Sequence, residues 1–132
     1  MATVVYPLAL EGFISGAIDL TTVNVKVVCV DTADYTYSAA HQFLSSIGAP
    51  ARVATSGNLA SKTVALGVFD AADVTITGVT GDQFEAVVVY VDTGVEGTSR
   101  LLCYIDSGTG FPLTPSGGNV IITWNASGIF SI

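Results

Sequence analysis

Apolar residues are concentrated in short runs that alternate with polar and glycine-rich segments. The strongest run covers 84–91 (FEAVVVYV), where nearly every position is apolar, and a second run of the same kind covers 100–105 (RLLCYI). Val, Tyr and Phe favour strands, and successive side chains of a strand point to opposite faces, so a strand that is apolar throughout is buried on both faces. The pattern therefore predicts a long hairpin over 84–106 whose first strand is central in a sheet.

Further strand-like runs are separated by clusters of Gly, Asp, Ser, Asn and Pro. They cover 24–30, 52–55, 62–69, 74–79, 120–124 and 129–132. After residue 51 the runs start roughly every 8–16 residues, a spacing typical of β-sandwiches and barrels. We therefore expect an all-β fold of about seven to eight strands, an antiparallel β-sandwich or partly open barrel that forms a single domain over 1–132. In the run 120–124, Trp124 shares a face with Val120 and Ile122, so we expect it in the core.

One segment has the pattern of a short α-helix. Ser38 is a good N-cap for a helix over 38–47, Phe43 and Ile47 recur on one side of it, and Gly48 then ends it. A helix of about three turns needs tertiary support. We expect it to pack over an edge or end of the sheet.

The first 22 residues are less regular than the rest. A short helix after Pro7 and an extended arm both fit them, because Gly12 and Gly16 weaken a helix. No basic residue precedes the first apolar residues, which argues against a secretory signal peptide. No apolar run approaches the roughly 20 residues that a membrane-spanning helix needs. We expect synthesis in the cytoplasm without membrane insertion.

Charged residues are scarce. They make up 11% of the chain, against about 25% in typical soluble domains, while 50% of the residues are hydrophobic. The net charge is −7, and the four basic residues are scattered. Binding to nucleic acids or anionic membranes requires clustered Lys and Arg, so both partner classes are excluded. The low charge instead suggests that other subunits cover part of the surface.

Two cysteines, Cys29 and Cys103, lie inside predicted strands. We interpret them as buried reduced thiols that act as small hydrophobic residues. A disulfide between neighbouring strands is the alternative.

His41 is the one histidine of the chain. A base–nucleophile pair would need a partner such as Ser45, four residues on, together with an orienting carboxylate and an oxyanion pocket. The chain has no phosphate-binding, metalloprotease or serine-hydrolase motif. We therefore interpret His41 as a helix or interface residue and expect neither catalytic residues nor a cofactor.

Two D-x-x-D pairs, Asp31 with Asp34 and Asp70 with Asp73, follow predicted strands. Oxygen-rich clusters can bind Ca²⁺, but the spacing of a known calcium loop is absent. Aspartates at turns also accept hydrogen bonds from their own backbone, which is the interpretation we favour over a metal site.

The loops are the places where contacts with partners are expected. Tyr35 and Tyr37 lie in one loop, the eight-residue hairpin loop covers 92–99, and 107–118 contains two prolines and four glycines. The candidate protein contacts are Tyr35, Tyr37, Asp92, Thr93, Val95, Glu96, Phe111 and Leu113. We expect that the hairpin loop can be shortened without affecting the fold. The loop aromatics could alternatively form a carbohydrate platform, or plug the ends of the sandwich.

Three stretches carry a family resemblance: 25–47 (VKVVCVDTADYTYSAAHQFLSSI), 62–82 and 84–124. In this order they resemble a group of small structural proteins of tailed bacteriophages and prophages. The resemblance implies a virion component, such as a capsid decoration or cement protein, the base of a head fibre, or a connector or tail accessory. It implies partners among copies of the chain and other virion proteins such as the major capsid protein. A receptor- or glycan-binding module of a fibre or tail is the alternative.

Overall fold

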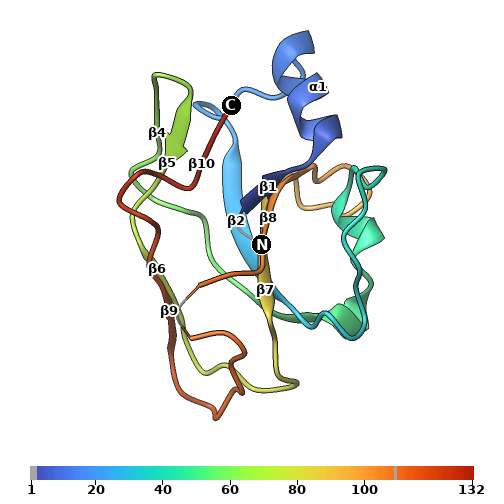
Figure 1. The fold of residues 1–132 in the computed structure, drawn as a ribbon, viewed down its shortest axis with the longest axis vertical. Helices are drawn as coiled ribbons and strands as arrows, with labels where there is room; N and C mark the ends of the chain where they lie inside the picture. Colours follow the sequence, from blue (N-terminus) through green and yellow to red (C-terminus); the bar gives the residue numbers. More distant parts are fainter. Residues whose placement is uncertain (1–2, 109) are drawn as a thin grey trace.

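The predicted hairpin lies at the centre of a five-stranded antiparallel sheet in the computed structural model, which describes residues 3–108 and 110–132 (Figure 1). The sheet has the order β1-β8-β7-β2-β3, with β1 (Thr3–Val5), β2 (Asn24–Val30), β3 (Arg52–Thr55), β7 (Ala86–Asp92) and β8 (Leu101–Ile105). β7 pairs with β8 on one side and with β2 along its full length on the other. Every residue from Ala86 to Val91 is buried. The prediction of a central strand buried on both faces is therefore confirmed.

Smaller sheets pack on one face of this sheet, in the layer drawn to its left in Figure 1. One has the order β10-β5-β4 and the other pairs β6 with β9; their strands are β4 (Thr63–Ala65), β5 (Val68–Asp70), β6 (Val74–Ile76), β9 (Val120–Ile122) and β10 (Phe130–Ser131). Buried Phe69, Ile76, Val120 and Phe130 join them to the hydrophobic core. The arrangement confirms an all-β, sandwich-like fold.

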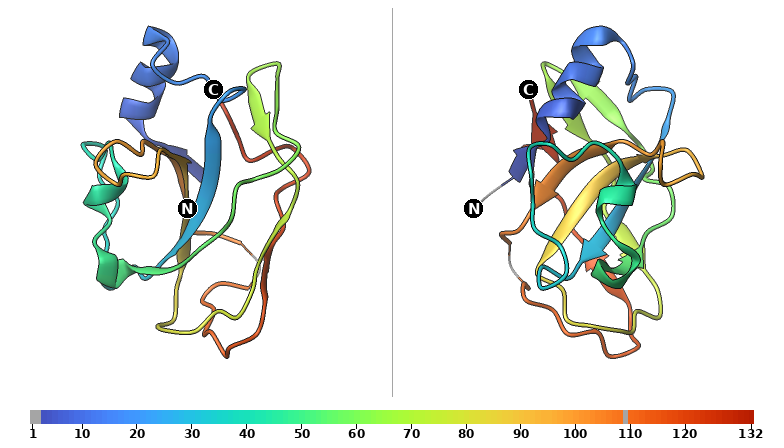
Figure 2. Two further views of the ribbon diagram at one scale, coloured as in Figure 1. Left: turned by 180° about the vertical axis from the view of Figure 1, so that it is seen from behind. Right: turned by 90° about the vertical axis from the view of Figure 1, so that its right-hand side faces the viewer.

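An irregular segment covers the opposite face of the five-stranded sheet (Figure 2). It contains two 3₁₀ turns, η1 (Leu44–Ser46) and η2 (Ala49–Ala51), and buries Tyr35, Leu44 and Ile47 against the sheet. The five-stranded sheet is thus the middle of three layers, which explains why β7 carries apolar side chains on both faces.

The helix predicted over 38–47 is wrong. Phe43 is extended and pairs with Arg100, and η1 is the one helical turn in that range. The Gln42 carbonyl accepts a hydrogen bond from Leu101 N–H, and Leu44 N–H donates to the Ser99 carbonyl. These bonds to the residues that lead into β8 replace the intrahelical bonds that the sequence pattern had suggested, because tertiary contacts override a weak local propensity.

The α-helix lies instead near the start of the chain, where a helix was one of two alternatives: α1 spans Pro7–Ser15. Pro7 occupies the first turn, and Gly16 ends the helix with φ of 81°. A Cβ atom at Gly12 would come within 2.5 Å of Ile18 Cδ1 and 3.0 Å of Arg100 Nη2, so this glycine permits close packing. No helix within the described residues is long and apolar enough to cross a membrane.

Three details differ from, or refine, the expectations. The described residues form ten strands, partly because 62–69 is a hairpin of β4 and β5 and not one strand. Trp124 is partly buried at the margin of the core, where its Nε1–H donates to the Ala72 carbonyl at 3.1 Å. Cys29 and Cys103 are buried free thiols, as predicted, and they lie on β2 and β8, which β7 separates.

Candidate functional site

Tyr35 and Tyr37 pack inward. Tyr35 is buried, and its hydroxyl lies 2.8 Å from the Tyr6 hydroxyl and 2.8 Å from His41 Nδ1. Tyr37 is partly buried, with its ring centroid 5.0 Å from that of Tyr6 and 5.5 Å from that of Tyr104. The two tyrosines fasten the outer segment to the five-stranded sheet, so Tyr35 offers no surface for a partner in this state.

The hairpin loop 92–99 is also tied to its own chain. Asp92 forms an ion pair with Lys26 at 3.1 Å, and Glu96 forms one with Arg52 at 2.9 Å. Although partial burial opposes it, the hydrogen bonds from Lys26 and from the Gly94 N–H lower the pKa of Asp92.

Other polar groups of this loop are hydrogen-bonded within the chain as well. The Thr93 N–H donates to Ser99 Oγ, and Ser99 is buried. Ser45 N–H donates to the Glu96 carbonyl. Val95 is the large apolar side chain that the loop leaves exposed. The loop therefore helps to hold the outer layer in place.

Phe111 and Leu113 are partly buried beside Phe84. Leu113 and Phe84 exchange two backbone hydrogen bonds of 3.0 Å, and the Phe111 ring packs edge-on against the Phe84 ring at 6.2 Å between centroids. The eight candidate contacts thus fall into three separate places, and the structure does not bring them together into one site.

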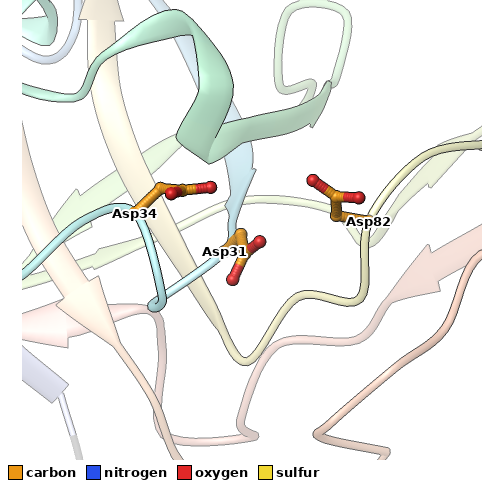
Figure 3. Close-up of side chains that lie close together, drawn as sticks. All are labelled: Asp31, Asp34 and Asp82. Atoms are coloured by element: carbon orange, nitrogen blue, oxygen red, sulfur yellow. The ribbon is translucent and has the colours of Figure 1, made fainter.

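Three carboxylates do come together, from Asp31, Asp34 and Asp82 (Figure 3). Their closest oxygens all lie within 4.8 Å of one another, and Asp34 and Asp82 are exposed. Asp31 Oδ1 also accepts a hydrogen bond from the Ala33 N–H, the turn role that the sequence suggested. Exposed acidic groups often lie close together without an ion, so this cluster is not assigned as a metal site.

The most distinctive surface lies at the end of the molecule where α1 and the β4–β5 hairpin are found (Figures 1 and 2). A groove of about 420 Å³ opens there, and most of its surface is apolar. Its apolar walls are formed by Phe13, Ile18, Leu20, Val64, Phe69 and Phe130. Asp19 is the one charged residue among the described residues that line it.

Two exposed hydrophobic residues, Val64 and Ile132, line this groove, and two more, Ile14 and Leu66, belong to α1 and the β4–β5 hairpin, which supply other lining residues. Leu66, at the tip of the β4–β5 hairpin, is fully exposed; Ile14 on α1 is 87% exposed, Ile132 65% and Val64 53%. We call the groove together with these four residues the apolar end. Contiguous exposed apolar surface bordered by polar residues marks interaction sites in soluble proteins. The apolar end is therefore the best candidate for a functional site.

None of the four exposed residues was among the predicted contacts. They lie far apart in the sequence, at positions 14, 64, 66 and 132, so only the fold brings them together. One local signal was available: Gly67 interrupts the run 62–69, and a glycine within a strand pattern often marks a turn or bulge.

No protein-family model matches this chain, and no curated protein matches it. The candidate site therefore rests on the geometry described above.

Proposed function

We propose that this chain is a non-enzymatic structural protein of a bacteriophage virion, a capsid decoration or cement protein that attaches through its apolar end. Its partners would be copies of itself and other virion proteins such as the major capsid protein. A connector or tail accessory would use the same surface. The sequence resemblance supports the virion as the location, and the apolar end supports attachment as the activity.

The exposure of the apolar end carries this proposal. Full burial of a Val, Leu or Ile side chain is worth roughly 1.5–3 kcal/mol relative to leaving it exposed. In the isolated chain, much of this free energy is not gained at four residues, because they are more than half exposed: Ile14, Val64, Leu66 and Ile132. On a symmetric particle, each copy would gain this free energy of burial by contacting an equivalent neighbour, so modest contacts repeat over the whole shell.

The surroundings of His41 fit a structural role. Its Nδ1 lies 2.8 Å from the buried Tyr35 hydroxyl, so the ring takes part in the polar contacts that attach the outer segment to the sheet.

Purified particles test the proposal. The chain should be found in them by mass spectrometry, with many copies distributed over the shell for a decoration protein and a single ring of copies for a connector. Ile132→Ser should reduce binding to particles that lack the protein, because Ile132 is 65% exposed and lines the groove. Ile121→Ser is the matched control, because Ile121 is 67% exposed on β9 and does not line the groove. Absence of the chain from particles would overturn the proposal.

A glycan-binding module is the second candidate. Phe111 and Trp124 line a cleft of about 990 Å³ between the layers, together with the polar side chains of Asn125 and Ser127. Aromatic rings combined with a few polar groups suit a small polar ligand. Saturable glycan binding that is lost in Trp124→Ala would favour this function, and a glycan array without binding would remove it.

A further inference from the structure

Strand β4 is an edge with one unused side. In the order β10-β5-β4 it pairs with β5 alone among the described residues, and Thr63, Val64 and Ala65 are all exposed. Natural edge strands are usually blocked by charges, prolines or bulges, because their free backbone groups can pair with another chain. β4 is short, with three residues, which also limits such pairing, but it carries no charge, proline or bulge.

The hairpin turn determines which backbone groups of β4 are free. Leu66 and Gly67 have φ of 51° and 77°, the two positive values of a type I′ turn. In such a two-residue hairpin the flanking pair, Ala65 and Val68, exchanges the hydrogen bonds. The next pair, Val64 with Phe69, does not, so the N–H and C=O of Val64 point away from β5.

Leu66 is an unfavourable choice for its position. Asn or Gly is preferred at the first central residue of a type I′ turn, because a Cβ atom crowds the backbone at positive φ. Leu66 is in addition fully exposed. Backbone strain of this kind is characteristically retained at functional positions. A contact made by Leu66 outside the isolated chain would account for both penalties.

We propose that a second copy of this chain binds here, with the two β4 strands pairing antiparallel about a two-fold axis at Val64. The N–H and C=O of each Val64 would bond to those of the other copy, and the two three-stranded sheets would become one sheet of six strands. Because Val64 lines the groove, this pairing places the two grooves side by side with the Leu66 side chains beside them. The inference names a partner for the apolar end and in that respect rests on the proposed function.

The charges near β4 are compatible with a second copy. Two-fold pairing sets Thr63 opposite Ala65 and Val64 opposite Val64, so no like charges meet within the strands. Lys62, which precedes β4, donates from Nζ to the Val23 carbonyl of its own chain. Since each copy carries a net charge of −7, long-range repulsion opposes the dimer, and added salt should strengthen it.

Sedimentation equilibrium of the full chain tests the pairing with two variants. Val64→Pro removes the outward N–H, at an edge position where proline is tolerated and the β4–β5 bonds are kept. It should leave a folded monomer. Leu66→Asn supplies the preferred turn residue, so it should raise the melting temperature of the monomer while weakening the dimer by about tenfold or more. Ile121→Asn is the control and should change neither.

The outcomes separate the two proposals. A wild-type chain that stays monomeric at all concentrations, or a dimer that Val64→Pro leaves intact, overturns the β4 pairing. If such a chain still binds particles through Ile132, the proposed function stands without the β4 pairing. A dimer that dissociates in both variants supports the pairing even if the chain proves absent from particles.

Discussion

The hydroxyl of Tyr6 lies 2.8 Å from the hydroxyl of Tyr35, although 29 positions separate the two residues in the sequence. Tyr6 connects β1 to α1, and Tyr35 belongs to the irregular outer segment. Tyr35 also bonds to His41, so its hydroxyl has two partners, whereas the hydroxyl of Tyr6 has one. This short chain of polar groups connects the N-terminal region to the outer layer inside an aromatic cluster.

The unequal number of partners predicts unequal effects of removing each hydroxyl. Tyr35→Phe leaves the fully buried Tyr6 hydroxyl without a partner and should lower the free energy of unfolding by about 1–3 kcal/mol. Tyr6→Phe leaves Tyr35 bonded to His41 and should cost about 0.5–1.5 kcal/mol. Urea unfolding of both variants measures the difference. Equal losses, or a larger loss in Tyr6→Phe, would contradict this account.

Buried tyrosines should make the fold sensitive to alkali. Burial raises the pKa of Tyr35 and that of Tyr90 from the ordinary value of 10.0 to about 12, and it also raises the pKa of Tyr6. The folded state therefore holds these protons more tightly than the unfolded state. The resulting stabilisation is complete below pH 10 and is lost as the pH rises toward 12. Denaturant midpoints measured across this range should fall, and less steeply in Tyr35→Phe; a flat profile would refute the prediction.

The thiols should be unreactive in the folded protein. Burial raises the pKa of Cys29 and that of Cys103 from 9.0 to about 12, so thiolate is scarce at pH 8, and neither sulfur is accessible. A thiol reagent at pH 8 should therefore label neither cysteine in the native state and both in urea. Rapid labelling without denaturant would show that β2 or β8 opens readily.

The contacts of the hairpin loop reverse the expectation that it can be shortened freely. Replacing 93–98 with Asn-Gly removes the Glu96–Arg52 ion pair and the Glu96 carbonyl that accepts a hydrogen bond from Ser45. It also disturbs Ser99, which is buried. We expect the free energy of unfolding, measured in urea, to fall by about 1–3 kcal/mol. The exposed ion pair contributes at most about 1 kcal/mol of this, and the lost backbone hydrogen bonds contribute the rest. Val95→Ser is the control, because Val95 is exposed, and it should be nearly neutral.

The central part of the fold could be predicted from the sequence because its signal is local. The run 84–91 is apolar at nearly every position, and such a strand can only be buried on both faces. The segment 38–47 had a similar local signal for a helix, but its contacts with distant residues determine its conformation. Its backbone bonds to Ser99 and Leu101, partners that a periodic pattern does not reveal.

The apolar end could not be predicted in the same way. Ile14 and Leu66 each look like ordinary members of a helix and of a strand, although both are exposed. The sequence does not show that α1 and the β4–β5 hairpin lie at the same end of the molecule. The loops were predicted as contact sites because they are long and contain turn residues. In the structure, the loops 31–37 and 92–99 mainly form hydrogen bonds and ion pairs with other parts of the same chain.

The pairing of β2 with β7 joins residues separated by half of the chain, from Asn24 with Asp92 to Val30 with Ala86. During synthesis the apolar β2 therefore leaves the ribosome well before β7 exists, at elongation rates of about 5–20 residues per second, and only its other partner β3 follows soon after it. Nonlocal strand pairing is also slow to form. Each nascent chain consequently passes through an interval of several seconds in which β2 lacks β7, and chaperones that bind exposed apolar segments would act during that interval.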